Sequence, residues 1–373
     1  MSSNISIFLN NIHTSSEVFL RQLFHAIDKT NKVEVLTFSK IKRVNEKCYF
    51  RTKNIAKPKS LYFLLHVLPI ALKYKTTRPK TLYYLFVLEM AKANKLYFPF
   101  LYMLVPFKDA LKLYKQLNPN KRIYSSIRGT EVTINPFTKD STVSDYKYIL
   151  QFVDKIHFLS EKLREQYLQL GLPDWPNTVI YQGVDKKKFY KGKTHDLPTD
   201  KLRLISIGRY DYVKGFEYLI LTCSELKKMG INFECSIVGY GTEKDKYDYM
   251  IHDLGLQKEV KLVTNVNHLT LPKIITSHNV YVHTHLVTGI SNSMLEAFSS
   301  GLPIISFYSD FDSYQIPGLN NYFIETPRYN YAALANKLKD FSYTNTIIES
   351  EIDKVLYKFT LEYQVEKFIQ FFH

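Results

Sequence analysis

The stretch from Tyr281 to Phe307, YVHTHLVTGISNSMLEAFSSGLPIISF, predicts a strand, a loop, a helix and a second strand. The β-branched and aromatic residues 281–284 favour a short strand, and the pair Ser291-Asn292 is suited to cap the helix that follows. Gly301-Leu302-Pro303 is typical of a helix end. Glu296 is unusual, because a carboxylate in an apolar helix face costs free energy unless it is paired or hydrogen-bonded. It either caps a backbone group at the helix edge or contacts a ligand.

A second motif lies upstream, where a strand ends at Gly208 and a helix begins near Phe216. Arg209 and Lys214 lie on the turn between them. This arrangement suits a diphosphate, since backbone N–H groups, the helix dipole and both cations converge on one anion. Cations in loops are usually only solvated, so this pair is weak evidence by itself.

A third motif, Gly239-Tyr240-Gly241, follows a strand over residues 235–238 and precedes a helix from about Glu243. Two glycines in three residues are as often a tight turn as a ligand loop. All three loops leave the carboxyl ends of strands in an alternating strand–helix series. They should therefore share one edge of a parallel sheet, which is where ligands of open α/β sheets bind.

Together these motifs resemble the donor half of glycosyltransferase family four, a group of retaining, nucleotide-sugar-dependent enzymes. The matching segments are Gly208-Arg209, Lys214-Gly215, Val238–Gly241, Gly289–Asn292, Leu295–Ala297, Gly301–Pro303 and, upstream, Gln182–Asp185. The resemblance covers roughly residues 123–345 well and the first hundred residues poorly. It implies the GT-B fold, an α/β architecture of two Rossmann-like domains with parallel sheets facing a central cleft.

The resemblance also implies roles for individual residues. Arg209 and Lys214 match the pair that holds the donor diphosphate and stabilises the leaving group. Glu296 matches the glutamate that accepts hydrogen bonds from the ribose hydroxyls. Thr288 occupies the place of a first glutamate close to the transferred sugar, so the predicted catalytic residues are Arg209, Lys214 and Thr288. The predicted donor-binding residues are Gly208, Arg209, Lys214, Gly239, Gly241, Gly289, Ile290, Ser291, Asn292 and Glu296.

The acceptor is implied to bind the N-terminal domain. Arg128-Gly129-Thr130-Glu131 occupies the place of a His-Gly pair found in many relatives. The segment Ser16–Phe19 and this Arg-Gly pair resemble the corresponding segments of enzymes that make bacterial surface polysaccharides. The predicted acceptor-side residues are Ser16, Glu17, Arg128 and Glu131. Neither a cofactor nor a metal site is predicted.

A chain of 373 residues is long enough for two domains with good cores. The predicted N-terminal domain is 1–185, the predicted C-terminal domain is 186–352, and 353–373 is a helix that crosses back to the N-terminal domain. Three cysteines without a paired framework fit a reducing compartment. No secretory signal pattern is apparent, so a cytoplasmic location is expected.

The net charge of +15 is concentrated in the first half of the chain. Residues 51–123 contain fifteen Lys and Arg against only Glu89 and Asp109, together with aromatic and apolar clusters too short to span a bilayer. Such segments commonly lie on an anionic membrane surface, so attachment to the inner face of the cell membrane is predicted. Core helices with solvated lysines are the plainer alternative. No nucleic-acid-binding motif is present, and nucleic acid is not predicted as a partner.

The sequence therefore predicts a hexosyltransferase that uses a nucleotide sugar and a saccharide acceptor, either lipid-linked or free, in polysaccharide or lipopolysaccharide biosynthesis. The alternative is a catalytically weak, nucleotide-sugar-binding partner subunit of the same fold, which Thr288 in place of a glutamate suggests.

Overall fold

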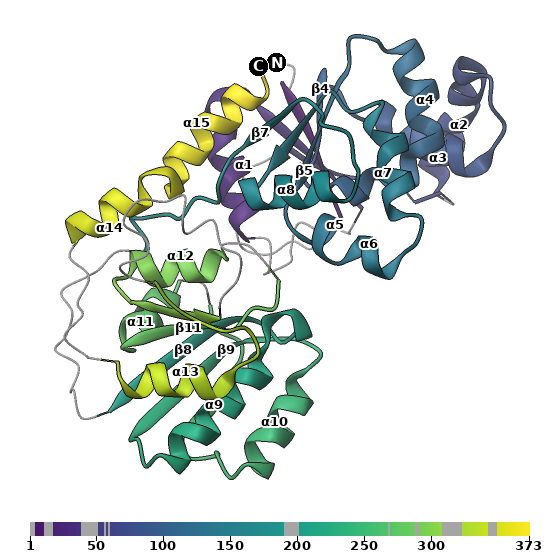
Figure 1. The fold of residues 1–373 in the computed structure, drawn as a ribbon. Helices are drawn as coiled ribbons and strands as arrows, with labels where there is room; N and C mark the ends of the chain where they lie inside the picture. Colours follow the sequence, from purple (N-terminus) through teal and green to yellow (C-terminus); the bar gives the residue numbers. More distant parts are fainter. Residues whose placement is uncertain are drawn as a thin grey trace. The chain divides into compact units, whose positions relative to one another are not determined.

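The structure is a computed structural model of the chain. It describes residues 4–10, 18–38, 51–55, 57–58, 60–189, 201–267, 269–287, 291–307, 323–341 and 349–373. The chain divides into two compact units (Figure 1). Unit 1 contains residues 1–181 and 364–373, and unit 2 contains residues 182–363.

Unit 1 is built on a seven-stranded, parallel sheet with the order β3-β2-β1-β4-β5-β6-β7. Its central strands are nearly continuous apolar runs, as expected for parallel strands that are buried on both faces. The strands are β1 (Ile5–Leu9), β2 (Val33–Thr37), β3 (Arg51–Asn54), β4 (Lys95–Phe98), β5 (Arg122–Ile127), β6 (Lys155–Phe158) and β7 (Asn177–Val179).

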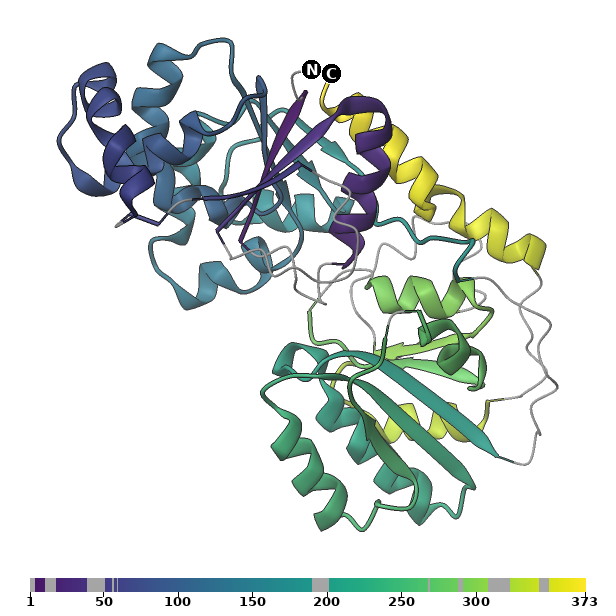
Figure 2. The ribbon, with the colours of Figure 1, turned by 180° about the vertical axis from the view of Figure 1, so that it is seen from behind.

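Two layers of helices cover this sheet. On one face, α1 (Val18–Asn31) and the end of α15 (Leu361–Phe371) pack against β1, β2 and β4 (Figure 2). The larger core lies on the other face. The elements that form it are α2 (Leu61–Tyr74), α3 (Pro79–Glu89), η2 (Leu101–Phe107), α4 (Lys108–Leu117), α5 (Thr130–Thr133), α7 (Thr142–Leu150) and α8 (Glu161–Gln169), with the short α6 (Asn135–Thr138) between α5 and α7.

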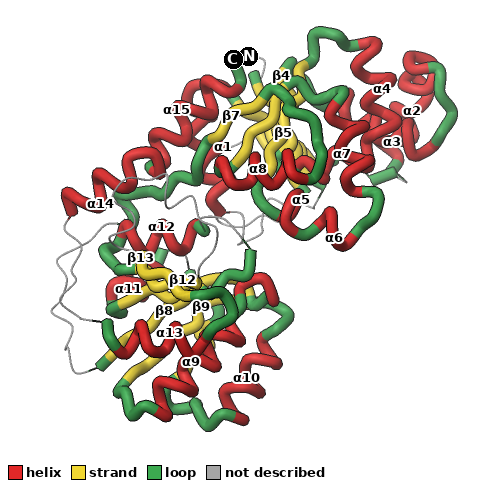
Figure 3. Tube along the Cα trace, viewed as in Figure 1, coloured by secondary structure: helices red, strands yellow, loops and turns green. Residues whose placement is uncertain are grey.

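Unit 2 repeats the plan with a six-stranded parallel sheet in the order β10-β9-β8-β11-β12-β13 (Figure 3). Its strands are β8 (Leu202–Arg209), β9 (Phe233–Tyr240), β10 (Val260–Val263), β11 (Val280–His283), β12 (Ile304–Phe307) and β13 (Phe323–Thr326). Its helices are η3 (Tyr212–Lys214), α9 (Phe216–Lys228), α10 (Lys244–Asp253), α11 (Leu271–Thr276), α12 (Asn292–Ser299), α13 (Tyr331–Lys339), α14 (Glu349–Leu356) and η6 (Tyr357–Phe359). The prediction of two parallel sheets is confirmed.

The helix expected near the end of the chain is interrupted at Thr360. This residue has an extended backbone (φ −81°, ψ 150°) between η6 and α15. Its hydroxyl accepts a hydrogen bond from the N–H of Tyr363 over 3.2 Å, as an N-cap residue does. Thr360 therefore ends one helical segment and starts the next.

Within the ranges that the structure describes, every helix is too short or too polar to cross a membrane.

Candidate active site

The sheet of unit 2 has a topological switch point between β8 and β11. Going outward from β8, the chain runs through β9 and β10 on one side, and through β11, β12 and β13 on the other. The loops that follow β8 and β11 therefore leave the carboxyl edge in opposite directions. Such a crevice is the usual ligand site of an open α/β sheet. Arg209, Lys214, Ser291 and Glu296 all lie on or directly after these two loops.

The turn after β8 is a short 3₁₀ helix held by its own side chains. Asp211 accepts a hydrogen bond from the N–H of Val213 over 3.3 Å. Gly215 then takes a left-handed conformation, with φ +60°, directly before α9 begins. The exposed Arg209 lies close by, with Nη2 3.9 Å from Oδ2 of Asp211. The turn thus gathers two cations at the N-terminus of a 13-residue helix, where the helix dipole also favours an anion.

The loop after β11 fixes this turn from the other side. Thr284 donates its hydroxyl proton to the carbonyl of Lys214 over 3.0 Å, and the N–H of Leu286 donates to the carbonyl of Val213 over 2.9 Å. A Cβ added to Gly215 would lie 2.3 Å from the carbonyl oxygen of Thr284. A glycine is required here both by its positive φ and by this close approach. The two loops at the switch point are consequently one hydrogen-bonded structure.

Lys214 is electrostatically unusual. Burial, and then the neighbouring charge of Arg209, lower its pKa from 10.5 to about 8, while Asp211 opposes the shift. Its side chain crosses the end of β8, because a Cβ on Gly208 would lie 3.3 Å from Cδ of Lys214. The charges of Lys214 and Arg209 repel each other, and a bound anion would relieve that repulsion.

His283 and His285 lie beside Lys214, and sequence reasoning did not select them. Their rings are 3.8 Å apart between centroids, and both residues are buried. Burial, together with the charge of Lys214, lowers the pKa of His283 to about 3. The pKa of His285 is also lowered, by burial, His283 and Lys214. Both imidazoles are therefore neutral near pH 7, and the positive charge at this edge comes from Lys214 and Arg209.

The N-terminus of α12 is attached to the end of β8. Ser291 caps the helix by accepting from the N–H of Met294 over 3.2 Å. Ser293 donates to the carbonyl of Ile207 over 2.9 Å, and Tyr281 lies 2.8 Å from Ser293 through their hydroxyl oxygens. The start of α12 thus faces the same crevice as Lys214. The sequence indicated the Ser291 cap but not the roles of Ser293 and Tyr281.

The burial of Glu296 differs from what the sequence predicted. It is half-buried rather than enclosed in the apolar face, which consists of Met294, Leu295, Ala297 and Phe298. In a helix, Glu296 shares a face with the residues three and four positions earlier, Ser293 and Asn292. Since Ser293 contacts the end of β8, this polar face of α12 borders the switch point. The charge of Glu296 also acts on Lys188. Burial lowers the pKa of Lys188 below its usual value, and the charges of Glu296 and Asp185 oppose that shift without cancelling it.

Close backbone packing explains why glycine occupies both position 239 and position 241. Gly239 pairs with Gly208 across β8 and β9, and an added Cβ would lie 1.8 Å from the carbonyl oxygen of Gly208. Gly241 has φ +152°, and its Cβ would lie 2.4 Å from the carbonyl oxygen of Tyr210. These glycines allow the ends of β8 and β9 to approach closely. Their predicted contact with the donor remains a prediction.

The predicted residues Ser16, Glu17, Thr288, Gly289 and Ile290 lie outside the described residues.

In unit 1, Arg128 and Glu131 follow β5 at the carboxyl edge of its sheet. Glu131 is fully buried and accepts hydrogen bonds from the N–H groups of Arg128 and Gly129 over 3.1 and 3.2 Å. Burial raises its pKa from 4.5 to about 7 against these bonds and the charge of Arg128. Glu131 therefore fixes the backbone of the turn after β5 that contains Arg128.

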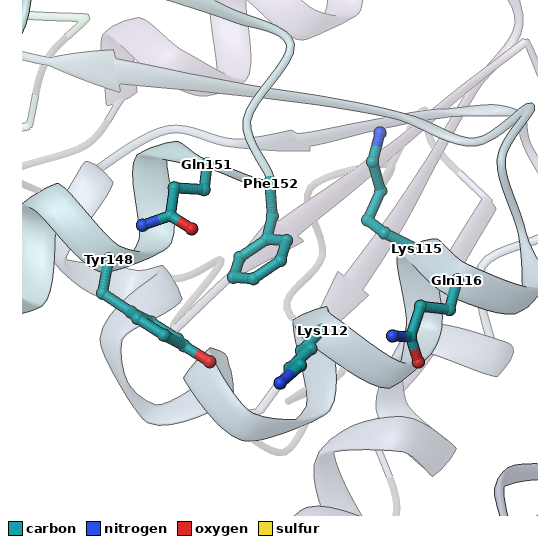
Figure 4. A pocket seen from close by; sticks show the side chains of 6 residues that line it. All are labelled: Lys112, Lys115, Gln116, Tyr148, Gln151 and Phe152. Carbon is teal, nitrogen blue, oxygen red and sulfur yellow. The ribbon is translucent and has the colours of Figure 1, made fainter.

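A cavity of about 420 Å³ lies elsewhere in unit 1 (Figure 4). It is lined by Lys112, Lys115, Gln116, Tyr148, Gln151 and Phe152. The first three lie in α4, Tyr148 lies in α7, and Gln151 and Phe152 directly follow α7, so all six precede β5 or β6 along the chain. The cavity therefore lies towards the amino ends of the strands, at the edge opposite Arg128 and Glu131. In the part of the chain that the structure describes, no three His, Cys, Asp or Glu side chains come close enough together to hold a metal ion.

Comparisons with known proteins match a region that contains both loops at the switch point. Residues 188–348, which include both loops at the switch point, match the sequence model of the family "Glycosyl transferases group 1". Over this region the chain is therefore similar to that family. Over 338 residues, the chain is 25% identical to the amylovoran biosynthesis glycosyltransferase AmsK of Erwinia amylovora, covering 81% of this chain and 82% of AmsK. It is 22% identical over 205 residues to the putative colanic acid biosynthesis glycosyltransferase WcaL of Salmonella typhimurium, covering 53% and 50% of the two chains.

Solved structures show a likeness in fold over the whole chain. Sucrose-phosphate synthase from Thermosynechococcus elongatus superposes with a TM-score of 0.75 at 16% identity and covers 99% of this chain and 98% of its own. HepE of Anabaena, solved in complex with UDP and glucose, gives a TM-score of 0.74 at 15% identity, with coverages of 99% and 98%. The GT-B fold predicted from the sequence is thereby confirmed.

Proposed function

We propose that the chain is a retaining hexosyltransferase that moves a hexosyl unit from a nucleotide sugar to a lipid-linked saccharide during assembly of a bacterial surface polysaccharide or lipopolysaccharide. The observation that carries the proposal is the pair of cations, Arg209 and Lys214, held at the switch point of unit 2 beside the N-terminus of α9. This arrangement has the charge and position to bind a diphosphate.

The chemistry follows from where charge develops. When the bond between the sugar and the diphosphate breaks, negative charge accumulates on the leaving phosphate. Lys214 and Arg209 stabilise that charge, and the Lys214 backbone is already fixed by Thr284. A preorganised cation is effective because little reorganisation is needed during the reaction. Thr288 is proposed to lie beside the transferred sugar.

The remaining donor contacts are assigned to the other elements at this edge. Glu296 accepts hydrogen bonds from the ribose hydroxyls, and the segment Gly289–Asn292 contributes backbone N–H groups to the sugar and phosphate. Ser291 and Ser293 hold the start of α12 in place. HepE of Anabaena, which is similar in fold, has also been solved with UDP-glucose, which supports a nucleotide sugar as the donor.

The acceptor is assigned to unit 1, on Arg128 and Glu131 together with Ser16 and Glu17. The names of AmsK and WcaL refer to the biosynthesis of amylovoran and colanic acid, which supports a surface polysaccharide as the product. A lipid-linked acceptor would be met at the inner face of the cell membrane, where we place the chain as a peripheral, cytoplasmic enzyme.

The test is a donor screen with two readouts. Purified protein is mixed with nucleotide sugars of different bases and hexoses, and the thermal unfolding shift and the release of nucleoside diphosphate are measured with and without saccharide acceptors. A correct donor at 100 times its dissociation constant should stabilise the protein by about 2.7 kcal/mol, and acceptor should increase diphosphate release. Stabilisation without release under every acceptor would favour the partner-subunit alternative. No stabilisation by any nucleotide sugar would contradict the proposal.

A further inference from the structure

Helix α2 is a short, well-capped helix of unit 1. Ser60 caps its start by accepting from the N–H of Phe63 over 3.2 Å. Lys75 ends it in a left-handed conformation, with its N–H bonded to the carbonyl of Ala71. Its 14 residues correspond to a length of about 21 Å, well below the roughly 30 Å needed to span a bilayer.

The inner face of α2 accounts for its attachment to unit 1. Phe63, Ile70 and Tyr74 are buried in the larger core. The ring of Phe63 makes edge contacts with Tyr83 and Phe86, with centroid distances of 5.7 and 5.2 Å. This buried stripe holds α2 against the core of unit 1.

The outer face is apolar as well. Five leucines, Leu61, Leu64, Leu65, Leu68 and Leu72, are between 55% and 71% exposed, and Tyr62 is 53% exposed. They follow helical spacing and so form one continuous stripe. Of the fifteen large hydrophobic side chains that are exposed in the described part of the chain, these are six. Single exposed apolar side chains are ordinary, but a contiguous group of this kind marks an interaction surface.

Cations adjoin this leucine stripe. Lys75, Arg78 and Lys80 are exposed where α2 ends and α3 begins. Lys73 is different, since its ammonium pairs with Glu89 over 2.7 Å and ties α2 to α3. The whole segment 51–123 contains fifteen basic and two acidic residues. A second copy of the chain would bring the same three cations against each other in a symmetric contact, which is unfavourable.

We propose that the leucine stripe of α2 inserts among the acyl chains of an anionic bilayer, while Lys75, Arg78 and Lys80 contact its headgroups. The inference rests on the membrane placement in the proposed function and names the segment that makes the contact, but it does not depend on the donor site. Figures 1 and 2 show α2 on the outside of unit 1, on the face of the sheet opposite α1 and α15. Because α2 is too short to span a bilayer and carries exposed leucines beside exposed cations, it would lie in the plane of the membrane interface.

Vesicle sedimentation tests the charge requirement, with no donor present. The protein should sediment with vesicles of phosphatidylcholine mixed with phosphatidylglycerol and much less with phosphatidylcholine alone. Each cation near an anionic surface contributes about a fivefold factor, that is about 1 kcal/mol. The combined change of Lys75, Arg78 and Lys80 to Gln should therefore weaken binding roughly a hundredfold. Raising the salt from about 0.1 to about 1 M should release most of the protein, because the Debye length falls from about 10 to about 3 Å.

The leucines are tested by the double variant Leu65→Ser with Leu68→Ser, which should lower vesicle binding by at least about tenfold through lost apolar burial. Matched controls lie in unit 2. Leu269→Ser removes a leucine that is 77% exposed. The combined change of Lys258, Lys337 and Lys339 to Gln removes three exposed charges, as many as the α2 variant does. Both controls should bind vesicles like the wild type.

A local probe identifies the inserted residue. The fluorescence of the Leu65→Trp variant should shift to the blue and be quenched by brominated lipid, whereas the wild-type signal from Trp175 should change little. Two results would overturn the proposal. One is an equal loss of vesicle binding in the α2 variants and in their unit 2 controls. The other is a concentration-dependent dimer, lost in the Leu65→Ser and Leu68→Ser variant, with no binding to anionic vesicles.

Discussion

Thr284 and Lys214 are seventy residues apart and are joined by a hydrogen bond of 3.0 Å, from the threonine hydroxyl to the lysine carbonyl. The bond connects the loops after β8 and β11 across the switch point of unit 2. Together with the bond from Leu286 to Val213, it fixes the backbone of the turn that holds both cations. The backbone of Lys214 is therefore held by the loop after β11.

The first prediction concerns the two cations. Lys214→Ala and Arg209→Ala should each lower turnover by about two to three orders of magnitude at saturating donor, as the loss of one preorganised charge-stabilising group does. Thermal unfolding should change little, since Arg209 is exposed at the end of β8 and Lys214 lies on the turn that follows. Lys273→Ala, an exposed lysine of the same unit, serves as the control. Near-wild-type turnover in either variant would show that the diphosphate binds elsewhere.

The second prediction is a pH dependence of donor binding. In the free protein, the pKa of Lys214 is lowered to about 8, so the ammonium is charged below that pH and neutral above it. Donor affinity should therefore be constant below about pH 8 and fall by up to tenfold per pH unit above it. The Lys214→Arg variant should show no such fall, because a guanidinium keeps its charge. Calorimetric titration across this range compares the two, and identical profiles would exclude Lys214 as the titrating group.

The third prediction separates ligand binding by Glu296 from a structural role. Glu296→Ala should raise the donor dissociation constant by tenfold or more, since a hydrogen bond to a charged group is worth about 1.5–3 kcal/mol. Because Glu296 is half-buried, the free energy of unfolding should change little. Lost stability with unchanged donor affinity is the result that a purely structural carboxylate would give.

The fourth prediction contrasts two paired glycines. Gly239→Ala places a Cβ 1.8 Å from the Gly208 carbonyl oxygen, so β8 and β9 must separate, at a cost of about 3 kcal/mol or more. A Cβ at Gly208 meets no backbone atom this close, only the side chains of Lys214 and Phe216, each at 3.3 Å. Gly208→Ala should therefore cost less stability than Gly239→Ala, and it should lower donor affinity through the displaced Lys214. Thermal unfolding and donor titration of both variants test the contrast. A Gly239→Ala variant as stable as the wild type would argue against the register of β8 and β9.

The fifth prediction concerns Glu131 in unit 1. Its pKa is raised from 4.5 to about 7, so the folded protein holds this proton more tightly than the unfolded chain does. The resulting stability is fully present below about pH 4.5 and is lost as the pH rises through 7. Between about pH 5 and pH 8, wild-type protein should lose about 2 to 3 kcal/mol more than the Glu131→Gln variant, which has no proton to release. Urea unfolding at both pH values measures this difference, and equal losses would show that Glu131 is ionised throughout.

The parallel sheets and the position of the site could be predicted from local sequence. Strand-like runs such as Leu204–Ile207 alternate with helical ones, and loops at the ends of parallel strands must share an edge. Arg209, Lys214 and the Ser291 cap lie where this reasoning placed them.

Contacts between distant segments could not be predicted in this way. Nothing near Thr284 or Ser293 in the sequence indicates that their hydroxyls bind the carbonyls of Lys214 and Ile207. The exposure of Glu296 depends on which stripe of α12 faces the sheet, and the sequence around it is apolar on both sides. For the same reason, the sequence of α2 left open whether its leucines are buried, because a helix that is apolar all round is usually a core helix.

The order in which the chain is synthesised gives the C-terminal residues a special importance. Phe368, Phe371 and Phe372 complete a core with Tyr97 and Tyr124, yet the ribosome makes them after all of unit 2. Most of unit 2 can therefore assemble during translation, while unit 1 must wait with part of one face of its sheet uncovered. Premature termination before residue 364 would leave that aromatic face open to water and prone to aggregation.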